Sequence, residues 1–96
     1  MKIKVIKNPG PDLLSRLGAL SWPVWKSPVT EFDWQYDEDE TCLFLEGEVE
    51  VESCGQKIKI SAGDLAVFGR GLVCRWRVLR PVRKHYSFSV PEGLLK

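Results

Sequence analysis

The segment that decides the fold is Glu40-Thr-Cys-Leu-Phe-Leu-Glu-Gly47, together with the later segment Gly63-Asp-Leu-Ala-Val-Phe-Gly-Arg-Gly71. Both are short apolar runs that end in glycine, which is typical of β-strands separated by tight bends. Alternate residues from Cys42 to Glu46 share one strand face, and the same alternation continues as glutamates only from Glu48 to Glu52. We therefore predict that the apolar face of this strand switches near Gly47, where a glycine bend or bulge causes no steric clash.

The rest of the chain repeats short β-branched and aromatic runs interrupted by Gly, Pro or Asp, a spacing that favours a sandwich or barrel. One short helix is predicted after Asp12, which we expect to be its N-cap. Ser53-Cys54-Gly55 should close a hairpin, and Gly63-Asp64 should form a turn in which the Asp64 carboxylate accepts backbone N–H bonds. The predicted strands are Lys2–Lys7, Val29–Tyr36, Thr41–Glu46, Glu48–Glu52, Gln56–Ile60, Leu65–Phe68, Val73–Leu79 and Lys84–Val90.

Glycine and carboxylate spacing adds a family resemblance. Glu40 and Gly47 stand at the last spacing of the first cupin motif, whereas its two histidine positions fall on Trp34 and Tyr36, or on Asp33 and Gln35. The second cupin motif is matched by Gly63, Gly69 in place of proline, Gly71, Cys74 in place of histidine and Val78 in place of asparagine. The chain thus resembles the cupins, which implies an all-β fold: a single cupin (jelly-roll, RmlC-like) barrel over residues 1–96 with one short N-terminal helix.

A narrower resemblance is to the small single-domain cupins related to the cupin domain of (S)-ureidoglycine aminohydrolase. It extends from about Trp22 to Phe88. The segments that carry it are Phe32-Asp33-Trp34, Tyr36, Glu40-Thr41-Cys42, Leu45-Glu46-Gly47, Gly63-Asp64, Gly71-Leu72, Cys74-Arg75-Trp76 and Lys84-His85-Tyr86.

A ligand pocket follows from strand alternation if Glu40 points into the barrel, as the cupin resemblance implies. The predicted ligand-binding residues are Trp34, Tyr36, Glu40, Cys74, Trp76, Lys84 and Tyr86. This mixture suits a small polar molecule that stacks on indole rings and hydrogen-bonds to Glu40 and Tyr36. The alternative is that Trp34 and Trp76 merely fill the barrel interior.

Metal binding is the expected property of a cupin, but the matched positions offer only Glu40 and Cys74 as donors. A zinc or iron site needs three or four protein ligands, so we expect no metal and no cofactor. His85, the only histidine, could activate Cys74. We favour the opposite face of its strand as interior, with Lys84 paired with Glu40, and the other possibility for Lys84 is that its head reaches solvent.

Composition sets outer limits on function. The 96 residues, 44% hydrophobic and 28% charged, indicate one ordinary globular domain. No apolar run approaches the ~20 residues that span a bilayer, and no signal peptide is recognisable, so we expect a cytoplasmic protein without membrane contact. Three cysteines without Cys-x-x-Cys spacing should be thiols.

Charge is distributed unevenly, with carboxylates between Glu31 and Glu52 and basic residues in the last third of the chain. Acidic and basic strands should therefore lie side by side or meet across a dimer, and we expect no nucleic-acid binding. Apolar residues on both faces of Thr41–Leu45 favour a homodimer. The functional hypothesis is a metal-free pocket for a small polar molecule. The alternatives are an aminohydrolase or other hydrolase of the ureidoglycine type, and a structural or interaction module whose partner surface is formed by Trp22, Trp25 and the N-terminal strand.

Overall fold

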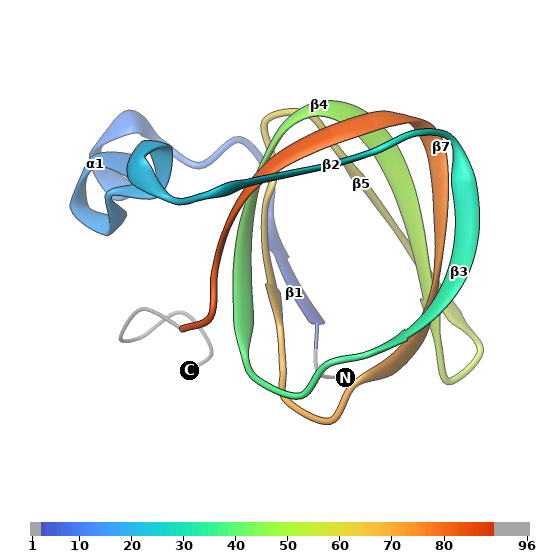
Figure 1. The fold of residues 1–96 in the computed structure, drawn as a ribbon. Coiled ribbons are helices and arrows are strands. Elements are labelled where there is room, and N and C mark those ends of the chain that lie inside the picture. The colour runs from blue at the N-terminus through green and yellow to red at the C-terminus, as the bar shows by residue number, and fades with distance from the viewer. Residues whose placement is uncertain (1–2, 90–96) are drawn as a thin grey trace.

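The computed structural model describes residues 3–89 (Figure 1), which form one antiparallel β-barrel with a short helix beside it. This confirms the predicted all-β fold with one short N-terminal helix. The elements in chain order are β1 (Ile3–Ile6), α1 (Pro11–Leu17), the 3-10 helix η1 (Ala19–Ser21), β2 (Val24–Ser27), β3 (Thr30–Gln35), β4 (Glu40–Ser53), β5 (Gln56–Ser61), β6 (Leu65–Phe68) and β7 (Val73–Ser87).

Two long strands organise the barrel. Strands β4 and β7 pair with each other, and each has a different neighbour on its other edge along its two halves. β4 is flanked first by β6 and then by β5, whereas β7 is flanked first by β3 and then by β2. The four segments predicted as separate strands, Thr41–Glu46, Glu48–Glu52, Val73–Leu79 and Lys84–Val90, are therefore halves of two bent strands. Val90 lies outside the described residues, and β2 was not predicted.

Gly47 is the bend in β4. Its φ is +94°, and the pairing of β4 with β7 shifts register on both sides of it. Before the bend Cys42 and Phe44 face the core, and after it Val49 and Val51 do so. The predicted switch of the apolar face is thus confirmed. A Cβ atom at Gly47 would lie 2.3 Å from the carbonyl oxygen of Pro81, so glycine also permits the close approach of the two backbones.

The predicted turns are present, and the helix starts slightly earlier than predicted. Cys54 and Gly55 both have positive φ in the β4–β5 hairpin, and the Asp64 carboxylate accepts the backbone N–H of Ser61 at 2.9 Å. The N-cap of α1 is Gly10, not Asp12, which lies in the first turn. Pro11 explains the difference, because proline is favoured at the first helical position, where no N–H bond is lost.

Apolar side chains form two clusters, one inside the barrel and one outside. The outer cluster consists of Ala19, Leu43, Leu65 and Val67, against which Leu13, Leu14 and Leu17 pack. The outer apolar face of Thr41–Leu45 is therefore covered by the chain's own helix, which removes the reason for which we expected a dimer. The dimer itself stays a prediction.

Acidic and basic strands lie side by side within the chain, as one of the two predicted arrangements required. Arg75 on β7 binds Glu31 and Asp33 of β3, and Arg77 binds Glu50 and Glu52 of β4. The hydrogen bond from Arg75 lowers the pKa of Glu31. No helix within residues 3–89 is both long and apolar enough to cross a lipid bilayer.

Candidate functional site

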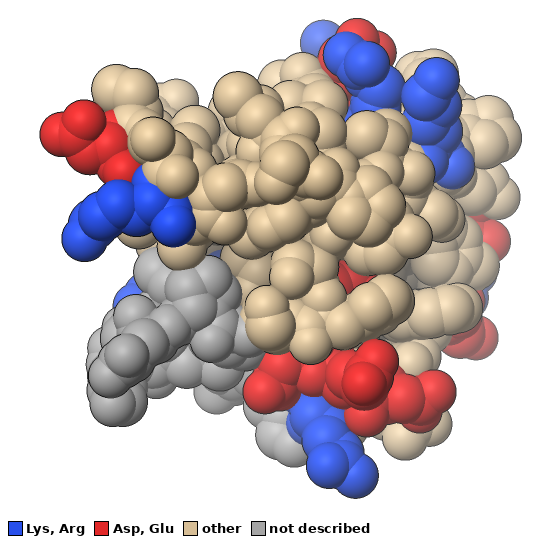
Figure 2. All heavy atoms as spheres, turned by 60° about the vertical axis from the view of Figure 1, so that its left-hand side comes forward, with Lys and Arg blue, Asp and Glu red and all other residues tan. Residues whose placement is uncertain are grey.

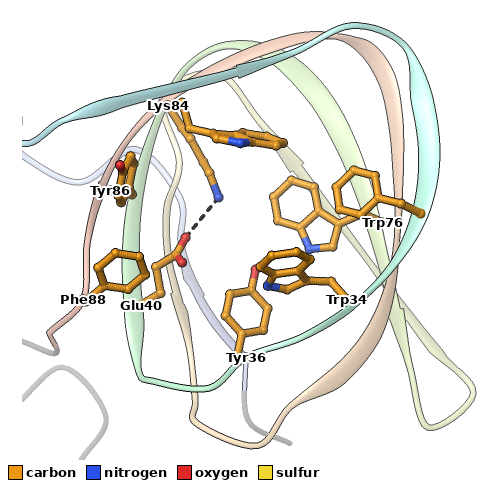
Figure 3. A pocket seen from close by; sticks show the side chains of 9 residues that line it. Trp34, Tyr36, Glu40, Trp76, Lys84, Tyr86 and Phe88 are labelled. Atoms are coloured by element: carbon orange, nitrogen blue, oxygen red, sulfur yellow. Dashed lines mark hydrogen bonds and ion pairs between the residues drawn. The ribbon is translucent and has the colours of Figure 1, made fainter.

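A pocket of about 240 Å³ opens from the barrel interior (Figure 3). Strands β3 and β7 supply most of its walls. Its lining residues are Trp25, Phe32, Trp34, Tyr36, Glu40, Trp76, Lys84, Tyr86 and Phe88. Trp34 is 52% exposed and Phe88 is also exposed, so aromatic rings continue from the buried wall to the rim.

Six of the seven residues predicted to bind a ligand surround this pocket, and Cys74 does not line it. On the β3–β7 ladder Cys74 lies opposite Trp34, and its thiol is buried in the barrel core beside Trp76. The large rings of its neighbours form the wall, because a cysteine side chain is too short to project past them. The prediction that Cys74 lines the pocket was therefore wrong.

A buried ion pair lies in the pocket. The Nζ of Lys84 is 3.1 Å from Oε2 of Glu40, and the two residues are only 5% and 9% exposed. Figure 3 shows the two side chains reaching toward each other from the neighbouring strands β7 and β4. The predicted inward orientation of Lys84 and its pairing with Glu40 are thus present. His85 points elsewhere, since its Nδ1 donates to the carbonyl oxygen of Trp22 at 2.7 Å.

Both partners of the pair have further contacts. The Lys84 ammonium lies 4.6 Å from the ring centre of Trp76 and 5.0 Å from that of Trp25, with Phe44 and Phe68 slightly farther away. Such cation–π contacts favour the charged amine. The Cys42 thiol donates to the same Glu40 oxygen, Oε2, at 3.0 Å. Among the described residues no donor reaches the other oxygen, Oε1, which is left available to a ligand.

Aromatic rings stack to form stiff walls. Tyr36 and Phe68 stack at 4.9 Å with an interplanar angle of 4°, and Phe32 stacks on Trp76 at 6.0 Å. Trp25 meets Trp76 edge-on at the same separation. The indole N–H of Trp76 is buried near the Tyr36 hydroxyl and the Cys74 thiol, but it makes no hydrogen bond of good geometry to a residue within 3–89. A buried donor without a partner is unfavourable, so an acceptor supplied by water or a ligand would stabilise this wall.

The phenol and the thiols near the pocket are held in their neutral forms. Burial raises the pKa of the Tyr36 hydroxyl well above its usual value, and burial does the same for the Cys42 thiol. Burial also raises the pKa of Cys74 to about 11. None of these groups is prepared to act as an anionic nucleophile near neutral pH. They can act as hydrogen-bond donors or as packing groups.

The residues present do not fit a cupin metal centre. No three His, Cys, Asp or Glu side chains in the described part of the chain come together as a possible ligand set. Glu40, the only carboxylate that residues 3–89 contribute to the pocket lining, is already bound by an ammonium group. A metal cation on Glu40 would therefore sit beside a like charge in a poorly solvated site.

Three lining residues, Trp25, Phe32 and Phe88, were not predicted. Phe32 could have been found, because it alternates with Trp34 and Tyr36 on the same strand face. Phe88 likewise continues the face of Lys84 and Tyr86. Trp25 could not have been found, because its strand β2 has only four residues and lies between Pro23 and Pro28, so its sequence pattern does not predict a strand.

Comparisons with known proteins identify the family but not a function. The profile of the EutQ-like cupin domain matches residues 14–86. A crystal structure of a DUF861 family protein from Thermotoga maritima is 50% identical, covers 91% of this chain and 99% of its own, and has a TM-score of 0.87. A search of curated proteins found no match.

Two EutQ structures are more distant. The EutQ protein of Clostridium difficile is 25% identical with a TM-score of 0.62, and the putative ethanolamine utilization protein Q of Salmonella typhimurium is 27% identical with a TM-score of 0.61. Each covers 66% of this chain, which spans only about half of theirs, 50% and 51%. The cupin resemblance is thereby confirmed, and no comparison points to ureidoglycine aminohydrolase in particular. The chain belongs to the EutQ-like cupin family.

Proposed function

We propose that this cupin binds a small, uncharged organic molecule with a planar body and one polar end, without the help of a metal ion. The observation that carries the proposal is the buried Lys84–Glu40 pair inside a pocket whose remaining walls are almost all aromatic. Concave, largely apolar sites with a few polar groups are the usual binding sites for small molecules.

The aromatic walls select the body of the ligand. The pocket, about 240 Å³, exceeds the cavity of roughly 150 Å³ that accommodates benzene in a protein core. An aromatic ring of the ligand, placed between Trp34 and Tyr86, could stack on the aromatic side chains of the pocket or pack edge-on against them. The exposed position of Trp34 would let it close over a bound molecule.

The ion pair selects the polar end and its charge. Lys84 and Glu40 cancel each other's charge, so a ligand that brought a net charge would leave one charge in this pocket uncompensated. A neutral hydroxyl, amide or carbonyl group can instead donate to Oε1 of Glu40 or accept from the Lys84 ammonium. The proposal therefore favours neutral molecules over carboxylates and amines of the same shape.

The aminohydrolase suggested by the narrower resemblance is not part of the proposal, because the described residues bring together no set of metal-ligating side chains of the kind that the resemblance implies for the reaction. The interaction-module alternative is not favoured, since Trp25 lines the pocket and Trp22 packs against the outer cluster, so both side chains already have contacts within the chain. Of the three hypotheses, binding of a small molecule is the one that accounts for the pocket, its aromatic lining and the buried ion pair together.

Calorimetry and ligand-detected NMR with three probes of one shape test the proposal: benzyl alcohol, benzoate and benzylammonium. Benzyl alcohol should bind most tightly, with a dissociation constant of about 1 mM, as expected for so small a molecule. Trp34→Ala should weaken it about tenfold, whereas the exposed control Val29→Ala should not. Tighter binding of either ion, or equal binding by both variants, would contradict the proposal.

A further inference from the structure

We propose that Lys84 is a carbonyl-capturing amine that forms a reversible Schiff base with a small aldehyde or ketone in the pocket. This inference rests on the proposed function, because it assigns a substrate class to the same site. It adds a covalent step, which binding alone does not require. Three features of the site support it: the access of the amine, the position of Glu40 and the charge of the product.

Access comes from the course of the lysine side chain. Lys84 lines the pocket, although it is only 5% exposed, so its amine can be reached from the pocket while the rest of its surroundings are protein side chains. Figure 3 shows the Lys84 amine extending into the space between Tyr86 and Trp34, where a carbonyl group that entered the pocket would meet it. Lysines that react through their amine are commonly enclosed in this way.

Glu40 is placed to move the protons. The ammonium of Lys84 is 3.1 Å from Oε2, within reach of direct proton transfer. Transfer of one proton to Glu40 leaves a neutral amine, whose lone pair forms a C–N bond to the carbonyl carbon as the π bond of the carbonyl group breaks. A proton then moves from the nitrogen to the carbonyl oxygen, which gives a carbinolamine. Glu40 returns its proton to this hydroxyl group, the C–O bond breaks, water leaves, and the nitrogen lone pair forms the C=N bond of a protonated imine. One carbonyl compound is consumed, one water leaves, and no oxidant or reductant takes part.

The product keeps the charge of the reactant. A protonated imine on Nζ carries the same single positive charge as the ammonium, beside the same Glu40 carboxylate and the same rings of Trp25 and Trp76. The surroundings that favour the ammonium therefore also favour the iminium. The pocket is apolar otherwise, which limits the access of water that would hydrolyse the imine.

Figure 2 shows a face of the molecule on which uncharged side chains predominate, with acidic groups gathered near one edge and a small acidic area visible within a hollow.

Exposed lysines elsewhere provide the comparison that a test needs. Lys57 and Lys59 on β5, and Lys26 on β2, lie outside the pocket lining and are open to solvent. They should react with aldehydes at the ordinary rate of a surface amine.

The test is reductive trapping on the intact chain. Benzaldehyde and sodium cyanoborohydride are added near neutral pH, and peptide mapping by mass spectrometry measures the benzyl adduct at each lysine. Lys84 should be labelled about tenfold faster than the three exposed lysines, because the carbonyl is held next to it. Excess benzyl alcohol should suppress labelling at Lys84 alone. The mapping needs no variant, so the result does not depend on a variant that folds.

Two variants refine the assignment. Lys84→Arg retains a cation but cannot form an imine, so no adduct should form at position 84, while Lys57 should still be labelled. Glu40→Gln should slow trapping at Lys84 about a hundredfold, as for loss of a proton-transfer group, and leave Lys57 unaffected. If benzyl alcohol binds but Lys84 is labelled no faster than the exposed lysines, the Schiff-base inference is wrong and the proposed binding function stands. If benzyl alcohol does not bind either, both are wrong.

Discussion

Loss of Lys84 should destabilise the protein more than loss of its buried partner Glu40. In Lys84→Met the Glu40 carboxylate would remain buried with only the Cys42 thiol as donor. Loss of one partner of a buried pair typically costs about 3–5 kcal/mol. In Glu40→Gln the ammonium would keep its four aromatic contacts, and the amide oxygen could still accept a hydrogen bond. We expect a smaller cost here, about 1–3 kcal/mol.

The double variant, Glu40→Gln with Lys84→Met, should be less destabilised than the sum of the single variants, because no charge is left unpaired. Urea denaturation followed by tryptophan fluorescence measures each free energy of unfolding, and Trp25 and Trp76 beside Lys84 make the signal local. Glu46→Gln is the matched control. It breaks the solvent-exposed pair with Arg83, whose side chains are 63% and 41% exposed, and should cost about 0–1 kcal/mol.

The reasoning fails if Lys84→Met costs no more than Glu46→Gln, because the pair would then be as well solvated as a surface pair. It also fails if Glu40→Gln costs more than Lys84→Met, since the aromatic rings would then contribute little to holding the ammonium.

Three further predictions concern the backbone, the thiols and metal content. Gly47→Ala should lower stability by about 3 kcal/mol or more, from positive φ plus backbone overlap, whereas Gly55→Ala, with positive φ but nothing within 4 Å, should cost about 1–2 kcal/mol in the same urea assay. Exposed Cys54 should react first with iodoacetamide. Alkylation of Cys74 should rise about tenfold per pH unit up to its pKa of about 11, because only the thiolate reacts, and faster labelling of Cys74 than of Cys54 at pH 8 would contradict this. Elemental analysis should find no stoichiometric transition metal, and one metal per chain that is lost in Glu40→Gln would refute the metal-free site.

Much of the fold could be read from local chemistry. Gly47, Gly55 and Gly63 mark bends that other residues adopt only with strain, and the apolar runs between them predict where extended segments lie. The sequence did not predict that two pairs of these extended segments are continuous strands. The segments on either side of Gly47, or of Pro81, look like separate strands, and only their pairing with long neighbours shows that β4 and β7 are single bent strands.

The candidate site divides in the same way. Strand alternation, together with the inward direction of Glu40 that the cupin resemblance implies, placed Trp34, Trp76 and Lys84 on interior faces, because the period of two is a local property of an extended chain. Which side chains reach the pocket depends on their length and on what lies opposite, so Cys74 was assigned to the lining although it is packed behind larger rings. Trp25 joined the site only through the pairing of β2 with β7.

The sequence by itself determined the all-β class, the bends and the inward alternation, since glycine conformations and the strand period act between residues that are close along the chain. Only the tertiary structure decided that Glu40 and Lys84, 44 positions apart, form one buried pair, and that the outer face of Thr41–Leu45 is covered by α1 instead of being left open. Both depend on which surfaces meet when the sheet closes, because burial and charge pairing are properties of contacts between distant segments.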